Sequence, residues 1–234
     1  MPKLTTIAFD ADDTLWGHEQ YFRLTETRFR ALLADHASPE ALGDRLLEAE
    51  RRNIAHYGFG VKAFTLSMIE TALEITEHQV PGTVIAEILA AGREMLVHPV
   101  ETLPYVDQVL TQLGQRFRLI LITKGDLFDQ ERKLAASGLA EHFSAVEIVS
   151  DKVEQTYRRI FDRHTDGADR TLMVGNSLKS DILPALAAGS YAVYVPAEFT
   201  WVLDHADEPV DNPRYRNIAS MGDLPGVIAQ IETT

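Results

Sequence analysis

The stretch TTIAFDADDTLW, residues 5–16, decides the fold, because a short apolar run in it leads directly into three aspartates. Residues 5–10 predict a β-strand, and an apolar run without alternation is typical of a strand buried on both faces. Asp10 and Asp12 are two residues apart, so in extended chain they project to the same side. One aspartate after a strand commonly caps a turn or helix, whereas this pair indicates a shared ligand.

Four similar runs lie further along the chain. They are RLILIT (118–123), AVEIVS (145–150), TLMVGN (171–176) and YAVYV (191–195). Helical patterns separate them, and two of these helices are expected to end at Gly138 and Gly189, where glycine suits a left-handed cap. Continuous apolar strands that alternate with helices predict an α/β fold with a doubly wound parallel sheet.

The sequence between residues 10 and 118 has no strand signal and is largely helical in pattern. Helices are expected over residues 21–34, 39–57, 63–76 and 80–96. Their apolar residues recur at spacings of three and four, which predicts packing into a helical core. We therefore expect an inserted helical domain, residues 17–98, within a core domain formed by residues 1–16 and 99–234.

Composition restricts the classes of partner. Lys and Arg number 22 and Asp and Glu number 35, so the formal net charge is −13, which disfavours nucleic acid and anionic membranes. The chain has no cysteine, which excludes disulfides and thiolate chemistry. The apolar run before Asp10 is too short for a signal peptide or membrane anchor, so a cytoplasmic location is expected. No pattern indicates an oligomeric state.

Polar residues follow four of the predicted strands, at the edge where open parallel sheets bind their ligands. Thr123 and Lys124 end the second strand, and Lys152 follows the third. Asn176 ends the fourth strand, and Asp181 follows it closely. Together with Asp10 and Asp12, these residues are predicted to line one pocket.

In this order, these segments resemble the four motifs of the haloacid dehalogenase-like hydrolase superfamily. FDADDTL (9–15) resembles its first motif, ILITKG (120–125) its second, Lys152 its third and VGNSLKSD (174–181) its fourth. The resemblance implies a Rossmann-like core and identifies the helical insert with the cap of the family's first cap class. It also implies a phosphatase that acts on a small phosphorylated metabolite.

The resemblance further implies roles for the acidic residues. Asp10 is expected to attack phosphorus and form an aspartyl-phosphate, while Asp12 acts as general acid and base. A Mg²⁺ ion is expected between Asp10, the backbone carbonyl of Asp12 and Asp181, which are hard oxygen ligands. Asn176 stands where the family more often has Asp, so its amide oxygen is a further possible ligand or a partner for metal-bound water. Asp13 stands where the family often has Gly.

The remaining expected site residues bind the substrate. Lys152 is expected to neutralise Asp10 and the phosphoryl oxygens, and the Thr123 hydroxyl to donate to the phosphate. Lys124 attracts substrate, faces solvent or pairs with a helix. Trp16 and His18, at the junction of core and insert, are candidate substrate contacts. The insert's segment YGFGVK (57–62) is either a substrate-facing loop or an interhelical turn.

Three alternatives stay open on sequence alone. Carbon–halogen hydrolysis also uses an aspartate nucleophile, but the dehalogenases lack an acid at the position of Asp12 and need no magnesium. The second alternative is phosphonate cleavage or sugar-phosphate mutase activity. Phosphonate cleavage usually needs a cap lysine that forms a Schiff base, and Lys62 is the only lysine of the insert. A non-catalytic binding module is the third, because fold alone does not establish activity.

Overall fold

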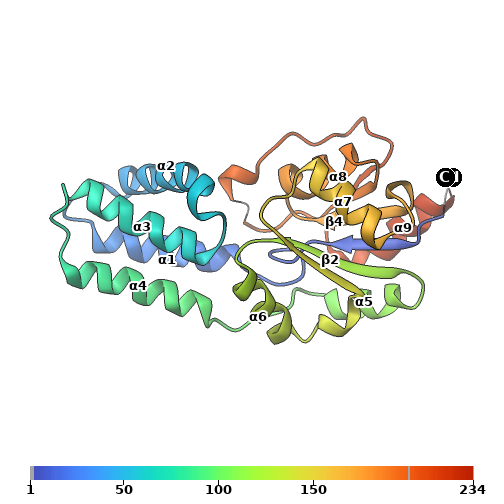
Figure 1. The fold of residues 1–234 in the computed structure, drawn as a ribbon, viewed down its shortest axis with the longest axis horizontal. Helices are drawn as coiled ribbons and strands as arrows, with labels where there is room; N and C mark the ends of the chain where they lie inside the picture. Colours follow the sequence, from blue (N-terminus) through green and yellow to red (C-terminus); the bar gives the residue numbers. More distant parts are fainter. Residues whose placement is uncertain (1–2, 200, 234) are drawn as a thin grey trace. The chain divides into compact units, whose positions relative to one another are not determined.

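The computed structural model of the chain describes residues 3–199 and 201–233. It separates into two compact units. The core unit comprises the residues up to 17, residues 100–124 and those from 130 onward, and the helical unit comprises residues 18–99 and 125–129. Figure 1 shows the course of the chain, coloured from the N-terminus to the C-terminus.

A parallel sheet of order β3-β2-β1-β4-β5-β6 forms the centre of the core unit. Its strands are β1 (Thr6–Phe9), β2 (Arg118–Lys124), β3 (Ala145–Val149), β4 (Thr171–Gly175), β5 (Tyr191–Tyr194) and β6 (Tyr215–Asn217). The first five coincide with the predicted strands. The sixth was not predicted, because three residues at a sheet edge carry no apolar run.

Strand register brings the ends of the central strands to one edge. Phe9 in β1 lies opposite Leu121 in β2 and Val174 in β4. The strand order reverses at β1, so the β1–β4 boundary is the topological switch point, where open α/β sheets bind ligands. Asp10 follows β1 at this boundary, and its backbone N–H continues the ladder by donating to the Val174 carbonyl at 2.9 Å.

Helices cover both faces of the sheet, as the continuous apolar strands predict. One face packs against α5 (Val106–Gly114), α6 (Leu127–Ser137) and α9 (Leu224–Thr233), and the other against α7 (Glu154–His164) and α8 (Leu183–Ala187). Neighbouring residues of one strand alternate between the faces: Ile7 and Phe9 join the first core, and Ala8 joins the second. The core unit is therefore doubly wound.

The helical unit is built on four helices, shown in blue to green in Figure 1. They are α1 (Glu19–Leu32), α2 (Pro39–Tyr57), α3 (Val61–Ile75) and α4 (Gly82–Leu96). Each lies within two residues, at both ends, of a predicted helix, and together they enclose an apolar core that includes Phe29, Leu42 and Met68. Within the described residues, no helix is long and apolar enough to span a membrane.

The segment after β4 differs from the single helix expected up to Gly189. Residues Leu178–Ile182 form a π-helical turn, and only Leu183–Ala187 continue as α-helix. Ser177 caps the turn, because its Oγ accepts a hydrogen bond from the Ser180 N–H at 3.0 Å. Such π-turns are frequent at functional sites, and this one carries Asp181.

Candidate active site

The loop after β1 folds back on itself and fixes the first two aspartates. The Ala11 carbonyl accepts hydrogen bonds from the backbone N–H groups of Thr14 (3.2 Å) and Leu15 (2.8 Å). Asp13 has φ 58°, in the left-handed region that glycine occupies without strain. Aspartate tolerates this region better than most residues, which explains how it stands at a position that the family often gives to Gly.

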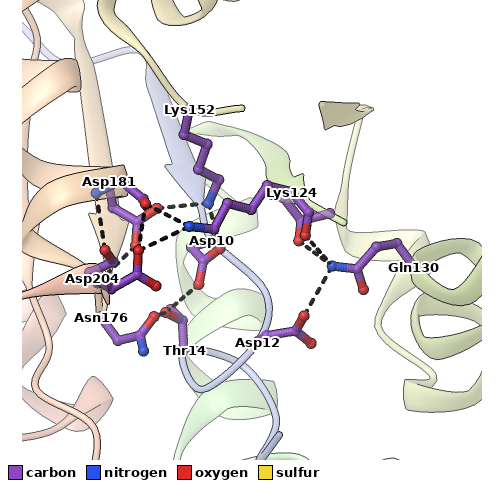
Figure 2. A network of polar contacts seen from close by, with 12 residues as sticks. Asp10, Asp12, Thr14, Lys124, Gln130, Lys152, Asn176, Asp181 and Asp204 are labelled. Atoms are coloured by element: carbon purple, nitrogen blue, oxygen red, sulfur yellow. Dashed lines mark hydrogen bonds and ion pairs between the residues drawn. The ribbon is translucent and has the colours of Figure 1, made fainter. Parts of the chain in front are cut away.

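Lys152 joins two buried carboxylates into what we call the Lys152 cluster: Asp10, Lys152 and Asp181. Its Nζ donates to Asp10 Oδ1 at 2.5 Å and to Asp181 Oδ1 at 2.7 Å (Figure 2). The exposed fractions are 7% for Asp10, 3% for Lys152 and 1% for Asp181. Three residues that follow three different strands thus meet in a site almost closed to water.

Two carboxylates share a single ammonium, so the Lys152 cluster carries one positive and two negative charges, a net of −1. Burial and the neighbouring Asp181 carboxylate together raise the pKa of Asp10 to about 7, against the opposing effect of the Lys152 ammonium. Burial on its own lowers the pKa of Lys152, but Asp10 and Asp181 outweigh that effect and hold its pKa above the ordinary value. Lys152 is therefore charged, and the cluster accommodates a further positive charge.

Asp181 is held from two sides. Its Oδ1 accepts from Lys152, and its Oδ2 accepts from the backbone N–H of Ser177 at 2.9 Å. A Cβ atom at Gly175 would lie 2.3 Å from this Oδ2, so only glycine leaves room for the carboxylate. The glycine that ends β4 is thus required by the close approach of Asp181.

Asn176 lies beside the oxygen atoms that the resemblance assigns to a metal. In one amide orientation, Thr14 Oγ1 donates to Asn176 Oδ1 at 3.1 Å, while the same hydroxyl lies 2.9 Å from Asp10 Oδ2 (Figure 2). In the opposite orientation, the amide nitrogen donates to Asp10 Oδ2 (3.1 Å), Thr14 Oγ1 (3.1 Å) and the Asp12 carbonyl (3.2 Å). Without a cation, the second orientation satisfies more hydrogen bonds.

The residues present fit a hard divalent cation. The Asp10 carboxylate, the Asp12 carbonyl and the Asn176 amide converge within hydrogen-bond distance of one another, and rotating the amide presents an oxygen in place of a nitrogen. The net negative charge of the Lys152 cluster favours the same ion. Among the described residues, no three His, Asp or Glu side chains gather to hold a metal by themselves. The set therefore depends on the backbone carbonyl and the amide.

Asp12 belongs to a second group, which we call the Asp12 cluster: Asp12, Trp16, Gln130 and Lys133. Lys133 Nζ contacts both carboxylate oxygens, at 2.7 and 2.8 Å. Trp16 Nε1 donates to Oδ1 at 2.7 Å, and Gln130 Nε2 donates to Oδ2 at 3.0 Å. The Asp12 side chain keeps 21% of its surface exposed, so it is fixed yet accessible.

The second motif contributes Thr123 and Lys124. Thr123 is 2% exposed, and its Oγ1 accepts from Gln130 Nε2 at 2.7 Å, which leaves its hydroxyl hydrogen available to another acceptor. Lys124 Nζ donates to Ser180 Oγ (2.8 Å) and Asp204 Oδ1 (3.0 Å). Lys124 is therefore paired within the site, which answers the sequence-based question of whether it faces solvent.

Three expected substrate contacts lie elsewhere than in the Lys152 cluster. Trp16 is 1% exposed, which leaves little surface for a substrate, and its indole contacts Asp12. His18 belongs to the helical unit and packs edge-on against Phe22, with ring centroids 4.9 Å apart. The segment 57–62 joins α2 to α3, with Gly58 and Gly60 both at positive φ.

Sequence reasoning missed several residues that the structure brings to the site. They are Thr14, Gln130, Lys133, Ser180 and Asp204. A usable signal was the spacing of Gln130 and Lys133, which puts two polar side chains on one face of a helix directly after the second motif. Asp204 lies in a loop 23 residues after Asp181 and carries no such signal.

Comparison with known proteins places the chain in a family. The model of the haloacid dehalogenase-like hydrolases matches residues 4–189. The N-acylneuraminate-9-phosphatases of Rattus norvegicus and Mus musculus are 28% and 29% identical over 135 residues, which is 54% of this chain and 52% of theirs. The chain thus spans about half the length of the curated relatives it matches.

Solved structures agree with the family in fold. A haloacid dehalogenase-like family hydrolase from Xanthomonas campestris is 38% identical, with a TM-score of 0.88 over 98% of this chain and 92% of that one. A magnesium-bound putative HAD-hydrolase, YfnB of Bacillus subtilis, is 18% identical (TM-score 0.66; 97% and 99% covered) and shares the fold. The family model, which spans most of the sequence, and the matching core show that the chain belongs to the haloacid dehalogenase-like hydrolases.

Proposed function

We propose that this hydrolase is a magnesium-dependent phosphatase that transfers the phosphoryl group of a small phosphate ester to Asp10 and then to water. The observation that carries the proposal is that Asp10 and Asp12, two residues apart, occupy two separate polar clusters. Asp10 Oδ1 contacts Lys152, whereas both oxygens of Asp12 contact Lys133. One carboxylate is thereby suited to attack and the other to proton transfer.

Asp10 supplies the nucleophile. Its Oδ2 accepts from Thr14 and its Oδ1 from Lys152, which fix the orientation of the carboxylate. In-line attack forms an oxygen–phosphorus bond and breaks the ester bond, and water then releases phosphate from the aspartyl-phosphate. Lys152, charged and buried, stabilises negative charge on the phosphoryl oxygens, and the Thr123 hydroxyl donates to one of them.

Magnesium would be held by the Asp10 carboxylate, the Asp12 carbonyl and the Asn176 amide oxygen, with Asp181 beside them. When bound, the ion supplies positive charge that balances the cluster and the incoming phosphoryl group. The side chains keep their own tasks. Asp181 holds Lys152 in position through the 2.7 Å contact, and Gly175 provides the room that Asp181 needs.

Asp12 separates phosphatase from dehalogenase chemistry. Its carboxylate is accessible and its direction is set by three donors, as general acid and base catalysis of an ester leaving group requires. Carbon–halogen hydrolysis has no leaving oxygen to protonate, and the family's dehalogenases lack this acid. The dehalogenase folds among the neighbours are less than 25% identical and bear on the fold alone.

The contacts of the Lys62 side chain do not favour phosphonate cleavage. Its Nζ forms an ion pair with Asp126 at 2.9 Å and lies 5.9 Å from the centre of the Phe128 ring. Schiff-base formation needs an amine that is free to attack a carbonyl, whereas this one is engaged by the Asp126 carboxylate. We propose that the helical unit, as a cap over the site, selects the substrate. The names of the curated relatives point to small organic phosphate esters.

The experiment is hydrolysis of p-nitrophenyl phosphate by the purified chain, with magnesium, with excess chelator, and by the Asp10→Asn variant. We expect turnover that needs magnesium and falls roughly 10⁴-fold or more in the variant. Glu131→Gln, an exposed change on α6, serves as the control and should keep full activity. Absence of any Asp10-dependent turnover, or halide release from a 2-haloacid without metal, would contradict the proposal.

A further inference from the structure

Helix α6 directs two buried polar side chains at Asp12. Gln130 and Lys133 are three residues apart, so they lie on the same face of the helix, and each is 4% exposed. A lysine and a glutamine this deeply buried on one helix face are costly to desolvate unless they are paired. Figure 2 shows the Gln130 nitrogen directed towards Asp12.

The Gln130 amide has a fixed direction. Its nitrogen lies within hydrogen-bond distance of Asp12 Oδ2 (3.0 Å), Thr123 Oγ1 (2.7 Å) and the Lys124 carbonyl (2.9 Å). Rotating the amide would set its oxygen against the carboxylate and the carbonyl, so this orientation is strongly preferred.

That orientation leaves one polar atom unsatisfied. Gln130 Oε1 is buried without a hydrogen-bond partner among the described residues. An orphaned buried acceptor costs about 1–3 kcal/mol, and such groups in folded proteins call for an explanation. Here the explanation is that the same amide must direct its N–H at Asp12 and Thr123.

Lys133 provides the charged part of the arrangement. Its ammonium contacts both oxygens of Asp12, so the carboxylate plane cannot turn without losing one contact. The Trp16 indole N–H holds Oδ1 from within the β1 loop. The β1 loop and helix α6, which are far apart in the sequence, thus both hold the Asp12 side chain.

We infer that Gln130 and Lys133 are positioning residues that hold Asp12 in the direction for proton transfer to the leaving oxygen. The inference rests on the proposed function, in which Asp12 is the general acid. Gln130 at the same time orients the Thr123 hydroxyl, because donating to Thr123 Oγ1 leaves that hydroxyl's hydrogen for the phosphoryl group. Both residues act through other side chains, Asp12 and Thr123.

The leaving group distinguishes positioning from mere structural support. An alkyl phosphate releases a basic alkoxide and needs the proton from Asp12, whereas p-nitrophenyl phosphate releases a stable phenolate and needs it far less. We expect Lys133→Met and Gln130→Leu to lower kcat/KM for an alkyl phosphate roughly 10- to 100-fold. The same variants should lower kcat/KM for the nitrophenyl ester much less.

A double-mutant cycle with Asp12→Asn sharpens the test. If Lys133 acts through Asp12, adding Lys133→Met to Asp12→Asn should cause no further selective loss on the alkyl ester. The exposed Glu131→Gln variant is the same-helix control and should leave both esters unaffected. Equal losses on both esters, or additive losses in the double variant, would overturn the inference.

Trp16 gives a readout that needs neither substrate nor metal. The chain has two tryptophans, so in a Trp201→Phe background the emission comes from Trp16 alone. Lys133→Met should move that emission towards the value of Asp12→Asn, and an unchanged emission in both variants would overturn the inference. If the wild type cleaves neither ester, the proposed function fails. The fluorescence measurement still tests whether Lys133 holds the Asp12 carboxylate in position.

Discussion

The Lys152 cluster and the Asp12 cluster are each built around a buried lysine that contacts aspartate, but their charges differ. In the Lys152 cluster, two carboxylates share one ammonium, at 2.5 and 2.7 Å. In the Asp12 cluster, one carboxylate meets one ammonium and two neutral donors. The first carries a net negative charge, and the second is balanced.

From this difference we propose different tasks for the two clusters. The unbalanced Lys152 cluster is stabilised by a further positive charge, whether a proton or a cation, which suits the binding of a metal and the transfer of a phosphoryl group. For the Asp12 cluster we propose a different task, which is to hold the orientation of the Asp12 carboxylate. Variants that change the charge of one cluster and not of the other test this contrast.

Lys152→Met should have the largest effect on stability. It leaves Asp10 and Asp181 buried without their cation, and breaking a buried ion pair by removing one partner costs about 3–5 kcal/mol. We expect the free energy of unfolding at pH 8 in chelator to fall by that amount, measured by urea denaturation. A loss no larger than that of an exposed substitution would show that the cluster is not desolvated.

Asp10→Asn should raise the free energy of unfolding at neutral and basic pH, whereas Lys152→Met lowers it. The pKa of Asp10 is raised to about 7 in the folded chain, so between pH 4 and pH 7 the folded state binds more protons than the unfolded state. Wild-type stability in chelator therefore falls as the pH rises through this window, and the variant escapes that loss.

The stability advantage of Asp10→Asn over the wild type should thus grow by about 2.6 kcal/mol from pH 5 to pH 8. Urea denaturation at the two pH values measures it, and added magnesium should reduce it because the ion balances the ionised carboxylate. An advantage independent of pH would show that Asp10 does not carry the unbalanced charge.

Lys133→Met should have the smallest effect on stability of the three. Asp12 keeps its contacts with Trp16 and Gln130 and remains partly exposed to water, so we expect a loss of about 2 kcal/mol. Because the cluster starts balanced, magnesium should not restore this loss. Thermal denaturation with and without magnesium measures it, and rescue by the metal would mean that the two clusters are not separate.

The fold was largely predictable from sequence because its signals are local. The strands of a sheet covered on both faces read as continuous apolar runs, as in residues 118–123 and 171–176. The edge strand Tyr215–Asn217 was not predictable, since it has only three residues and no apolar run. The π-turn after β4 was missed for a different reason: it depends on how Asp181 packs against Gly175.

The site was predictable where a residue follows a strand, as Asp10, Asn176 and Asp181 do. Gln130 and Lys133 escaped because a polar residue on a helix usually faces solvent, and only the packing of α6 against the β1 loop shows that these are buried. Asp204 reaches Lys124 from a long loop, and loop geometry leaves no periodic pattern to interpret.

We expect Asp10 to become phosphorylated during turnover, and mass spectrometry can detect this modification. The chain is mixed with p-nitrophenyl phosphate and magnesium, quenched in acid during turnover, and digested. Our account predicts one added phosphoryl group on the peptide that contains Asp10, absent in Asp10→Asn and in chelator. Turnover without this modification, or a phosphoryl group on another residue, would contradict it.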